Sequence, residues 1–489
     1  MNAFENLMAH MRTSEALGDA IGHLYWDRDT QMPENAGGQR AEVLASMHGI
    51  LHERRTDPRI GEWLAAIGES GMSPENRANI RIIRNDFERF LKLPQDLPRK
   101  LAKETSLAQA VWKHAKESNS TEEYLPALEK VVDLKRDEAE ALADGGDAYD
   151  ALLDKYESGT SASMIEPIFA RLRKGLVELL GAVGDRDLRA PAPKANFPTE
   201  TQLEFARELA RAFSYDFERG RLDVTAHPFS AGSGDDARIT TRTDEKDPFN
   251  CIYSTIHETG HAVYERNIDR KFLFQPVGRA ASFGVHESQS RLFENQLGRG
   301  RAFCGWMYRR MRDAYGEFGV SSENEFYASV NRVDAGYIRT DADEIHYNLH
   351  VLMRFDLERE IIRGHLRTSD IEEAWNARFE ADFGHKVDKP SNGFLQDVHW
   401  SVGEFGYFPT YTLGNIYAGC LFAALTKDLP DLNDSLGRGS AEPATDWLQS
   451  AVHRFGALRL PRETIETACG FEVSEKPLLR YLEEKFSSI

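Results

Sequence analysis

The sequence predicts a mainly α-helical protein with a small β element near its middle. Short β-prone runs at 222–225 and 238–243, separated by Gly, Ser, Asp and Pro, indicate two or three strands. Helix is predicted again from Ile252 onward, with loops near 274–284 and 384–415. Before the strands, apolar residues recur at the three- and four-residue intervals of amphipathic helices in segments 39–54, 74–91, 95–116, 121–142 and 199–219.

Local signals support the order of these helices. Ser73 precedes the helix predicted over 74–91. Ser120 is expected to cap the helix predicted over 121–142, with Glu123 three residues later. Breaks are predicted at 145–146, where two glycines meet, and at the Pro- and Ala-rich stretch 189–198, which is the best linker candidate.

Length and charge limit the classes of protein. With 489 residues, the chain could form two to four domains or one large one. The 41% hydrophobic content suits a globular protein with a sizeable core. The formal net charge is −19, from 79 acidic and 60 basic residues, which makes nucleic acid an unfavourable partner.

The cysteines and apolar runs point to a soluble cytoplasmic protein. The four cysteines are scattered and form no CxxC pair, so a disulfide framework is not expected. The N-terminal segment does not read as a secretory signal. The longest apolar stretch, 416–425, is about half the length that a membrane span needs.

A metal site is predicted at His257-Glu258-Thr259-Gly260-His261. Two histidines four residues apart lie on one face of a helix and can bind one metal ion. Glu258 beside them could take a proton from a metal-bound water and pass it to a leaving amine. With 15 histidines in the chain, roughly 0.04 such motifs are expected by chance. Gly260 could let another segment approach closely.

Glu287, 26 residues after His261, is the candidate third ligand. Catalytic zinc often takes two His and one Glu and keeps a fourth position for water. The alternative for Glu287 is an acidic residue favoured by the start of a helix. Glu294, two turns further on, is either a partner of a metal-bound imidazole or a solvated surface residue.

The motifs of a known family follow in order along the chain. The sequence resembles the carboxypeptidase Taq family of metallocarboxypeptidases. Besides the HExxH helix, the shared motifs are HPF at 227–229, DxRxT at 236–240, HESQ at 286–289, IRxxAD at 338–343 and GxxQDxHW at 393–400.

The resemblance covers essentially the whole chain. It implies a single catalytic domain over 1–489, two-lobed and largely helical, with a small sheet beside a deep groove. The N-terminal helices, about 1–200, would form a wall, and the motifs would occupy about 220–415. It also implies a homodimer, removal of single residues from peptide C-termini with broad tolerance, metal ligands His257, His261 and Glu287, and Glu258 as catalytic base.

A carboxypeptidase must bind a free C-terminal carboxylate, which an arginine does best through paired hydrogen bonds. Arg339 and Arg238 are the candidates, because each lies in a shared motif. The alternative for Arg339 is a surface ion pair with Asp343, and for Arg238 an edge-strand bridge to Asp236. His227 could line the groove or serve as a turn residue.

Hydrogen-bond donors are also needed for the carbonyl oxygen, which becomes negative during hydrolysis. His399 and Tyr407 are the candidates, by analogy with related helical zinc peptidases. Tyr411 is an alternate, because 406–411 resembles a loop, and simple core packing is the other possibility. Asp397 could hold the His399 tautomer, although residues two apart do not face each other on a helix.

The sequence therefore predicts a metallocarboxypeptidase acting on peptides with a free C-terminus. Zinc is the expected ion, with cobalt and manganese as alternatives for the same ligands. The rival functions are an endo-acting oligopeptidase on the same scaffold, a helical binding protein that keeps a metal, and a zinc aminopeptidase. No segment resembling GxMEN, which would bind a substrate amine, is present.

Overall fold

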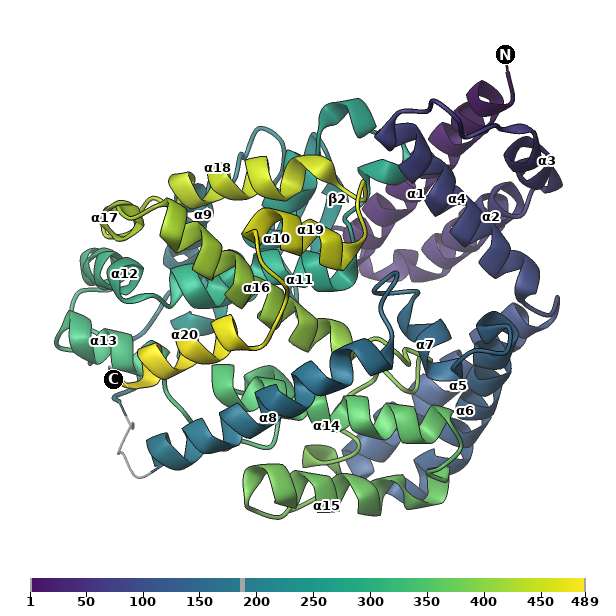
Figure 1. The fold of residues 1–489 in the computed structure, drawn as a ribbon. Coiled ribbons are helices and arrows are strands. Elements are labelled where there is room, and N and C mark those ends of the chain that lie inside the picture. Colours follow the sequence, from purple (N-terminus) through teal and green to yellow (C-terminus); the bar gives the residue numbers. More distant parts are fainter. Residues whose placement is uncertain (1, 185–189, 488–489) are drawn as a thin grey trace. The chain divides into compact units, whose positions relative to one another are not determined.

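The fold is mainly helical, as predicted. A computed structural model describes residues 2–184 and 190–487; it is 69% helical and contains one three-stranded sheet (Figure 1). Among the described residues, no helix is both long and apolar enough to cross a bilayer. The four cysteines are free thiols, three of them buried.

The chain forms two compact units, and each is assembled from three separate segments. The first unit contains Met1–Phe90, Ala190–Asn331 and Tyr417–Val473, and the second contains Leu91–Arg189, Arg332–Ile416 and Ser474–Ile489. The N-terminal helical part, expected over about 1–200, is thus divided between the units. A single domain over 1–489 stays a prediction.

The predicted linker coincides with one unit boundary. Its first residue, Arg189, lies outside the described residues. From there on the stretch is fixed within the first unit, because the backbone amides of Lys194 and Phe197 donate to the carbonyls of Phe318 and Glu245. The Pro- and Ala-rich composition therefore marks a boundary, and the described part of it is an ordered connection.

Twelve α-helices begin in the described part of the first unit. In chain order they are α1 (Ala3–Thr30), α2 (Gly37–Arg55), α3 (Pro58–Ala66), α4 (Pro74–Lys92), α9 (Thr199–Ala212), α10 (Pro248–Asn267), α11 (Phe283–Arg291), α12 (Arg301–Tyr315), α13 (Glu323–Val330), α17 (Leu432–Leu436), α18 (Glu442–Ala451) and α19 (Pro461–Cys469).

The second unit holds the other long helices. They are α5 (Leu97–Ser118), α6 (Thr121–Ala143), α7 (Ala148–Leu153), α8 (Ala162–Gly184), α14 (Glu344–Ile362), α15 (Ile371–Phe383), the first part of α16 (Pro409–Asp428) and α20 (Lys476–Ser487). Here α14 packs against α6, α8 and α15 and is buried along most of its length.

Helix ends differ from the predictions where local hydrogen bonds decide them. Ser73 accepts from the Asn76 amide as a cap should, but Ser120 makes no side-chain cap bond, so the predicted capping box on α6 is wrong. α9 ends at Ala212 because Ser214 takes a left-handed conformation, with φ of 63°. α10 begins early because Asp247 caps its first turn.

The sheet positions α10. The strands β1 (Leu222–Val224), β2 (Ser230–Ser233) and β3 (Asp236–Thr241) are ordered β1-β3-β2; β3 pairs in parallel with β1 and antiparallel with β2. The Thr241 hydroxyl lies 2.9 Å from that of Ser254 and 3.0 Å from that of Thr255. Ile239 packs in the buried cluster that includes Cys251 and Ala262. The central strand therefore lies against the helix that carries the predicted metal motif.

Candidate active site

The two motif histidines lie on α10 and face the same side of that helix. The ring centroids of His257 and His261 are 4.9 Å apart. Their Nε2 atoms lie 3.7 and 3.6 Å from the same oxygen, Oε2 of Glu287 on α11. The predicted metal ligands are thus brought together within the first unit.

A glycine allows α11 to come this close. A Cβ atom on Gly260 would lie only 2.7 Å from the Gln289 carbonyl oxygen and 2.7 Å from Cα of Ser290. Both are backbone atoms of α11 and cannot swing aside. The expectation that Gly260 permits a close approach is confirmed, and the approach is what places Glu287 opposite the histidines.

The donor set fits a divalent metal ion. One atom from each of His257, His261 and Glu287 lies within 4.8 Å of the others. Ligands at about 2.0–2.2 Å from a tetrahedral ion are themselves about 3.3–3.6 Å apart, close to the distances seen here. Arg291 donates to Oε1 of Glu287 at 2.7 Å, and Oε2, which accepts a longer bond of 3.2 Å from the Ser290 hydroxyl, is the oxygen nearest both histidines.

The partner of the first histidine is Glu294. Its Oε2 lies 2.9 Å from Nδ1 of His257, and Arg299 and Arg291 contact the same carboxylate at 3.3 and 3.4 Å. Burial opposes ionisation of Glu294, but His257 and the two arginines hold its pKa well below the usual range. Of the two alternatives for Glu294, the bond to the His257 imidazole is therefore correct, and it leaves Nε2 of His257 facing Glu287.

A second histidine pair supports His261. The ring of His286 stacks on that of His261, with centroids 4.2 Å apart and planes at 13°. Nε2 of His286 is 3.1 Å from Glu265, one turn after His261 on α10. The HESQ motif thus contains both a candidate ligand, Glu287, and a ring that packs on another candidate ligand, His261.

Glu258 is positioned to act as a base. It is 7% exposed and makes no hydrogen bond or ion pair within the described part of the chain. Burial raises the pKa of this carboxyl to about 7, and a dication nearby would favour its charged form. Because no described residue forms a hydrogen bond or ion pair with this carboxylate, it can accept a proton from water.

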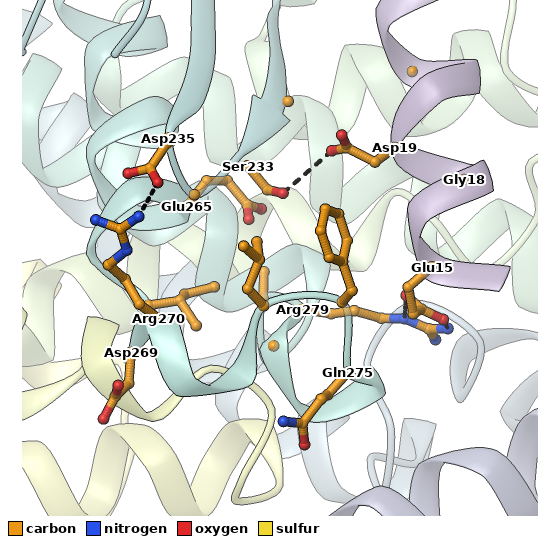
Figure 2. A pocket seen from close by; sticks show the side chains of 18 of the residues that line it. Glu15, Gly18, Asp19, Ser233, Asp235, Glu265, Asp269, Arg270, Gln275 and Arg279 are labelled. Atoms are coloured by element: carbon orange, nitrogen blue, oxygen red, sulfur yellow. Dashed lines mark hydrogen bonds and ion pairs between the residues drawn. The ribbon is translucent and has the colours of Figure 1, made fainter. Parts of the chain in front are cut away.

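A cavity of about 390 Å³ lies beside the C-terminal half of α10 (Figure 2). Figure 2 shows Glu265 among its lining side chains, with Asp19 of α1 hydrogen-bonded to Ser233 and with Arg270 paired to Asp235. Because Glu265 also holds His286, the cavity adjoins the metal centre. None of the residues predicted to bind metal or substrate lines it.

The other two predicted residues of the first unit are engaged or exposed. Arg238 lies on β3, where it makes a two-bond pair with Asp236 at 2.7 and 2.6 Å and its guanidinium lies over the Trp26 ring. The expected bridge to Asp236 is confirmed, but β3 is the central strand and not an edge. His227 is exposed in the turn between β1 and β2.

In the second unit, Arg339 belongs to a buried charge cluster. It is 5% exposed, and its Nε and Nη2 donate to Oδ1 of Asp397 at 3.2 and 2.9 Å. Arg354 contacts the other oxygen of the same carboxylate at 2.7 Å. The alternative of a surface pair with Asp343 is wrong, because Asp343 caps α14 instead.

The three candidate carbonyl-oxygen donors form one aromatic cluster in the second unit. Nε2 of His399 is 3.2 Å from the Tyr411 hydroxyl, and the Tyr407 ring contacts both residues. Burial lowers the pKa of His399 to about 4, so this imidazole is neutral at pH 7. Tyr411 lies in the first turn of α16 and not in a loop. Nδ1 of His399 is 3.9 Å from Asp397, too far for the proposed tautomer bond.

Two arginines that bind site carboxylates, Arg354 and Arg291, were not among the predicted residues. Arg354 lies in none of the motifs, and only the fold shows that it shares Asp397 with Arg339. Arg291 had a weak signal, since an arginine four residues after Glu287 on a helix can pair with it.

Two imidazoles and a carboxylate converging on one point, with a buried carboxylate beside them on an HExxH helix, define the site of a metallopeptidase. Comparison with known proteins also indicates a metallopeptidase. The sequence model of one family, described as carboxypeptidase Taq (M32) metallopeptidase, matches residues 6–486. The chain belongs to this family, which confirms the resemblance.

Individual relatives span the whole chain. Thermostable carboxypeptidase 1 of Thermus thermophilus is 39% identical, covering 100% of this chain and 99% of that protein. The protein of the same name from Pyrococcus furiosus is 32% identical, covering 99% and 98%. The M32 carboxypeptidase structure from Deinococcus radiodurans has a TM-score of 0.94 at 38% identity, over 99% of each chain. The protein is therefore a metallocarboxypeptidase, a hydrolase that acts on peptides.

Proposed function

We propose that the protein releases single residues from free peptide C-termini with broad side-chain tolerance, with Glu258 as general base. The convergence of His257, His261 and Glu287 carries this proposal, together with the adjacent Glu258 carboxylate, which no other described residue binds. A binding protein that only stores a metal has no use for a base at that position.

The three ligands would hold one divalent ion per subunit. Zinc is the proposed ion, and cobalt or manganese suits the same donors. When bound, such an ion supplies a Lewis acid for a carbonyl group and lowers the pKa of a water molecule.

Glu258 would take the proton of the attacking water and return it to the leaving amine. Its carboxylate suits this role, because no other described residue forms a hydrogen bond or ion pair with it. General acid and base catalysis of this kind contributes about 10²–10⁴-fold to the rate.

Arg339 is the proposed ligand of the substrate carboxylate. Two buried guanidiniums, Arg339 and Arg354, share the single carboxylate of Asp397, so the ionic cluster carries one positive charge in excess. A buried surplus of charge is costly unless an anion joins it, and a C-terminal carboxylate is such an anion. Arg238 is less suited, because Asp236 already binds its guanidinium twice; His227, exposed, stays a candidate for lining the groove.

His399 and Tyr407 are the proposed donors to the carbonyl oxygen, with Tyr411 as the alternate. A neutral imidazole keeps one N–H to donate, and a tyrosine hydroxyl provides another donor. Losing one such donor typically costs about 2.7–4 kcal/mol in the transition state.

Metal analysis combined with activity tests the proposal. We expect about one equivalent of a divalent metal, loss of C-terminal residue release on chelation, and recovery when zinc, cobalt or manganese is restored. Full activity of the chelated, metal-free protein would contradict the proposed mechanism. The homodimer and the cytoplasmic location stay predictions, and light scattering of the purified protein tests the first.

A further inference from the structure

Glu358 of α14 has a fully buried carboxyl group with three hydrogen-bond partners, and burial raises its pKa to about 8. Its Oε1 accepts from the indole Nε1 of Trp400 at 2.9 Å. Its Oε2 accepts from the Tyr149 hydroxyl at 2.9 Å and from the backbone amide of Gly406 at 3.1 Å. All four residues belong to the second unit.

Two of these donors lie at the two ends of one loop. Trp400 follows His399 directly, and Gly406 directly precedes Tyr407. A single carboxylate therefore fixes the chain next to each of the two residues proposed to donate to the carbonyl oxygen. Gly406 also has a positive φ of 82°, and a Cβ there would lie 2.8 Å from the backbone of α7.

The same helix holds the start of this segment. Arg354, one turn before Glu358 on α14, binds Asp397, two residues before His399. Segment 397–406 is thus attached to α14 at Asp397, Trp400 and Gly406. A carboxyl group is costly to bury even when it is neutral, and an apolar residue would fill the same space at less cost. Its three bonds are best explained by the orientation that they impose on the segment.

We propose that Glu358 is a positioning residue that sets the geometry of His399 and Tyr407. This inference rests on the proposed function, in which these two residues contact the substrate. Misplacing a reacting group by about 1 Å can cost about a hundredfold in rate. Loss of the Glu358 bonds should therefore lower kcat more than it weakens substrate binding.

Glu358→Gln is the main test, because the side chain keeps its size but loses one acceptor. Trp400→Phe removes the bond at Oε1, along with part of a buried ring, and is the second test if Glu358→Gln does not fold. The matched control is Glu344→Gln on the same helix. That partly buried carboxylate binds Tyr481 and Lys485 of α20, so its loss perturbs α14 without touching segment 397–407.

We expect Glu358→Gln to lower kcat about tenfold to a hundredfold, with KM within about twofold and metal content unchanged. Trp400→Phe should show a smaller loss of the same kind, and Glu344→Gln should change thermal stability only. In a chain already carrying His399→Gln and Tyr407→Phe, Glu358→Gln should cost less than about twofold more, because its effect acts through those residues.

Two results would overturn the inference. If Glu358→Gln keeps the kcat of the Glu344→Gln control while His399→Gln and Tyr407→Phe lower kcat, the proposed donors stand and the positioning role is wrong. If His399→Gln and Tyr407→Phe leave kcat unchanged, the donor assignment fails and the positioning role fails with it.

Discussion

At the scale of single residues, Glu258 has the most specific role. It is buried beside the metal ligands and engaged in no hydrogen bond or ion pair with any other described residue. We expect Glu258→Gln to lower kcat by about 10²–10⁴-fold while metal content stays the same, because glutamine cannot take up the proton. Steady-state kinetics with metal analysis of the same sample measures both quantities. Turnover equal to wild type would refute the role.

Asp397 should make the free energy of unfolding depend on pH in the acidic range. Burial alone raises its pKa, but the guanidiniums of Arg339 and Arg354 hold the pKa well below the ordinary value. A carboxyl whose pKa is lower in the folded state stabilises the protein above its unfolded pKa of about 3.9 and loses that contribution as pH falls below it.

The variant Asp397→Asn tests whether the charge of Asp397 stabilises the folded protein. At pH 7 we expect a loss of about 3–5 kcal/mol in the free energy of unfolding, because two buried guanidiniums lose their partner. The difference from wild type should shrink as pH falls below about 4. Denaturant unfolding of both proteins across pH measures it, and a difference that does not change with pH would show that the Asp397 charge contributes nothing.

Residue-scale prediction from sequence worked where spacing along one helix determines geometry. His257 and His261 are four residues apart, so their shared face follows from the helical period. The partner of Arg339 could not be found this way. Asp397 and Arg354 lie far from it in sequence, and only the packing of the second unit makes one carboxylate serve two arginines.

At the scale of elements, the contact between α10 and α11 brings the three candidate metal ligands together. We expect Gly260→Ala to weaken metal binding at least about tenfold and to lower stability by about 1–3 kcal/mol, because the new methyl group must push the α11 backbone away. Competition with a metal chelator and thermal unfolding measure the two effects.

Gly49→Ala is the matched control. Gly49 is exposed on α2 with nothing within 4 Å of the position that its Cβ would take. Its replacement should leave metal affinity unchanged and raise stability by up to about 1 kcal/mol, as alanine favours helix. Equal metal affinity in both variants would mean that the close helix contact does not position Glu287.

Helix positions were predictable from periodicity, but some ends were not. α2, α4, α5 and α6 all lie within three residues of their predicted starts and ends. α9 ends early where Ser214 turns left-handed, and Tyr411 is helical because α16 begins at Pro409. Such helix ends depend on the backbone conformation of single residues. Hydrophobic periodicity, which is judged over a segment of many residues, does not detect it.

At the scale of the whole molecule, sequence predicted the class better than the organisation. The motifs led to a metallocarboxypeptidase, and the family match confirms this class. The two units could not be predicted, since each takes three segments from distant parts of the chain. Hydrophobic periodicity identifies helices and strands but not which distant segments pack together.

The most direct test of the central claim compares one peptide with a free C-terminus and the same peptide amidated. We expect the free acid to lose its C-terminal residues one at a time, and the amide to be cut at least about tenfold more slowly, because a neutral amide loses the charge-assisted bonds to an arginine. Chelation should stop both reactions. Equal cleavage of the amide, or release of internal fragments, would contradict a carboxypeptidase and favour an endo-acting oligopeptidase.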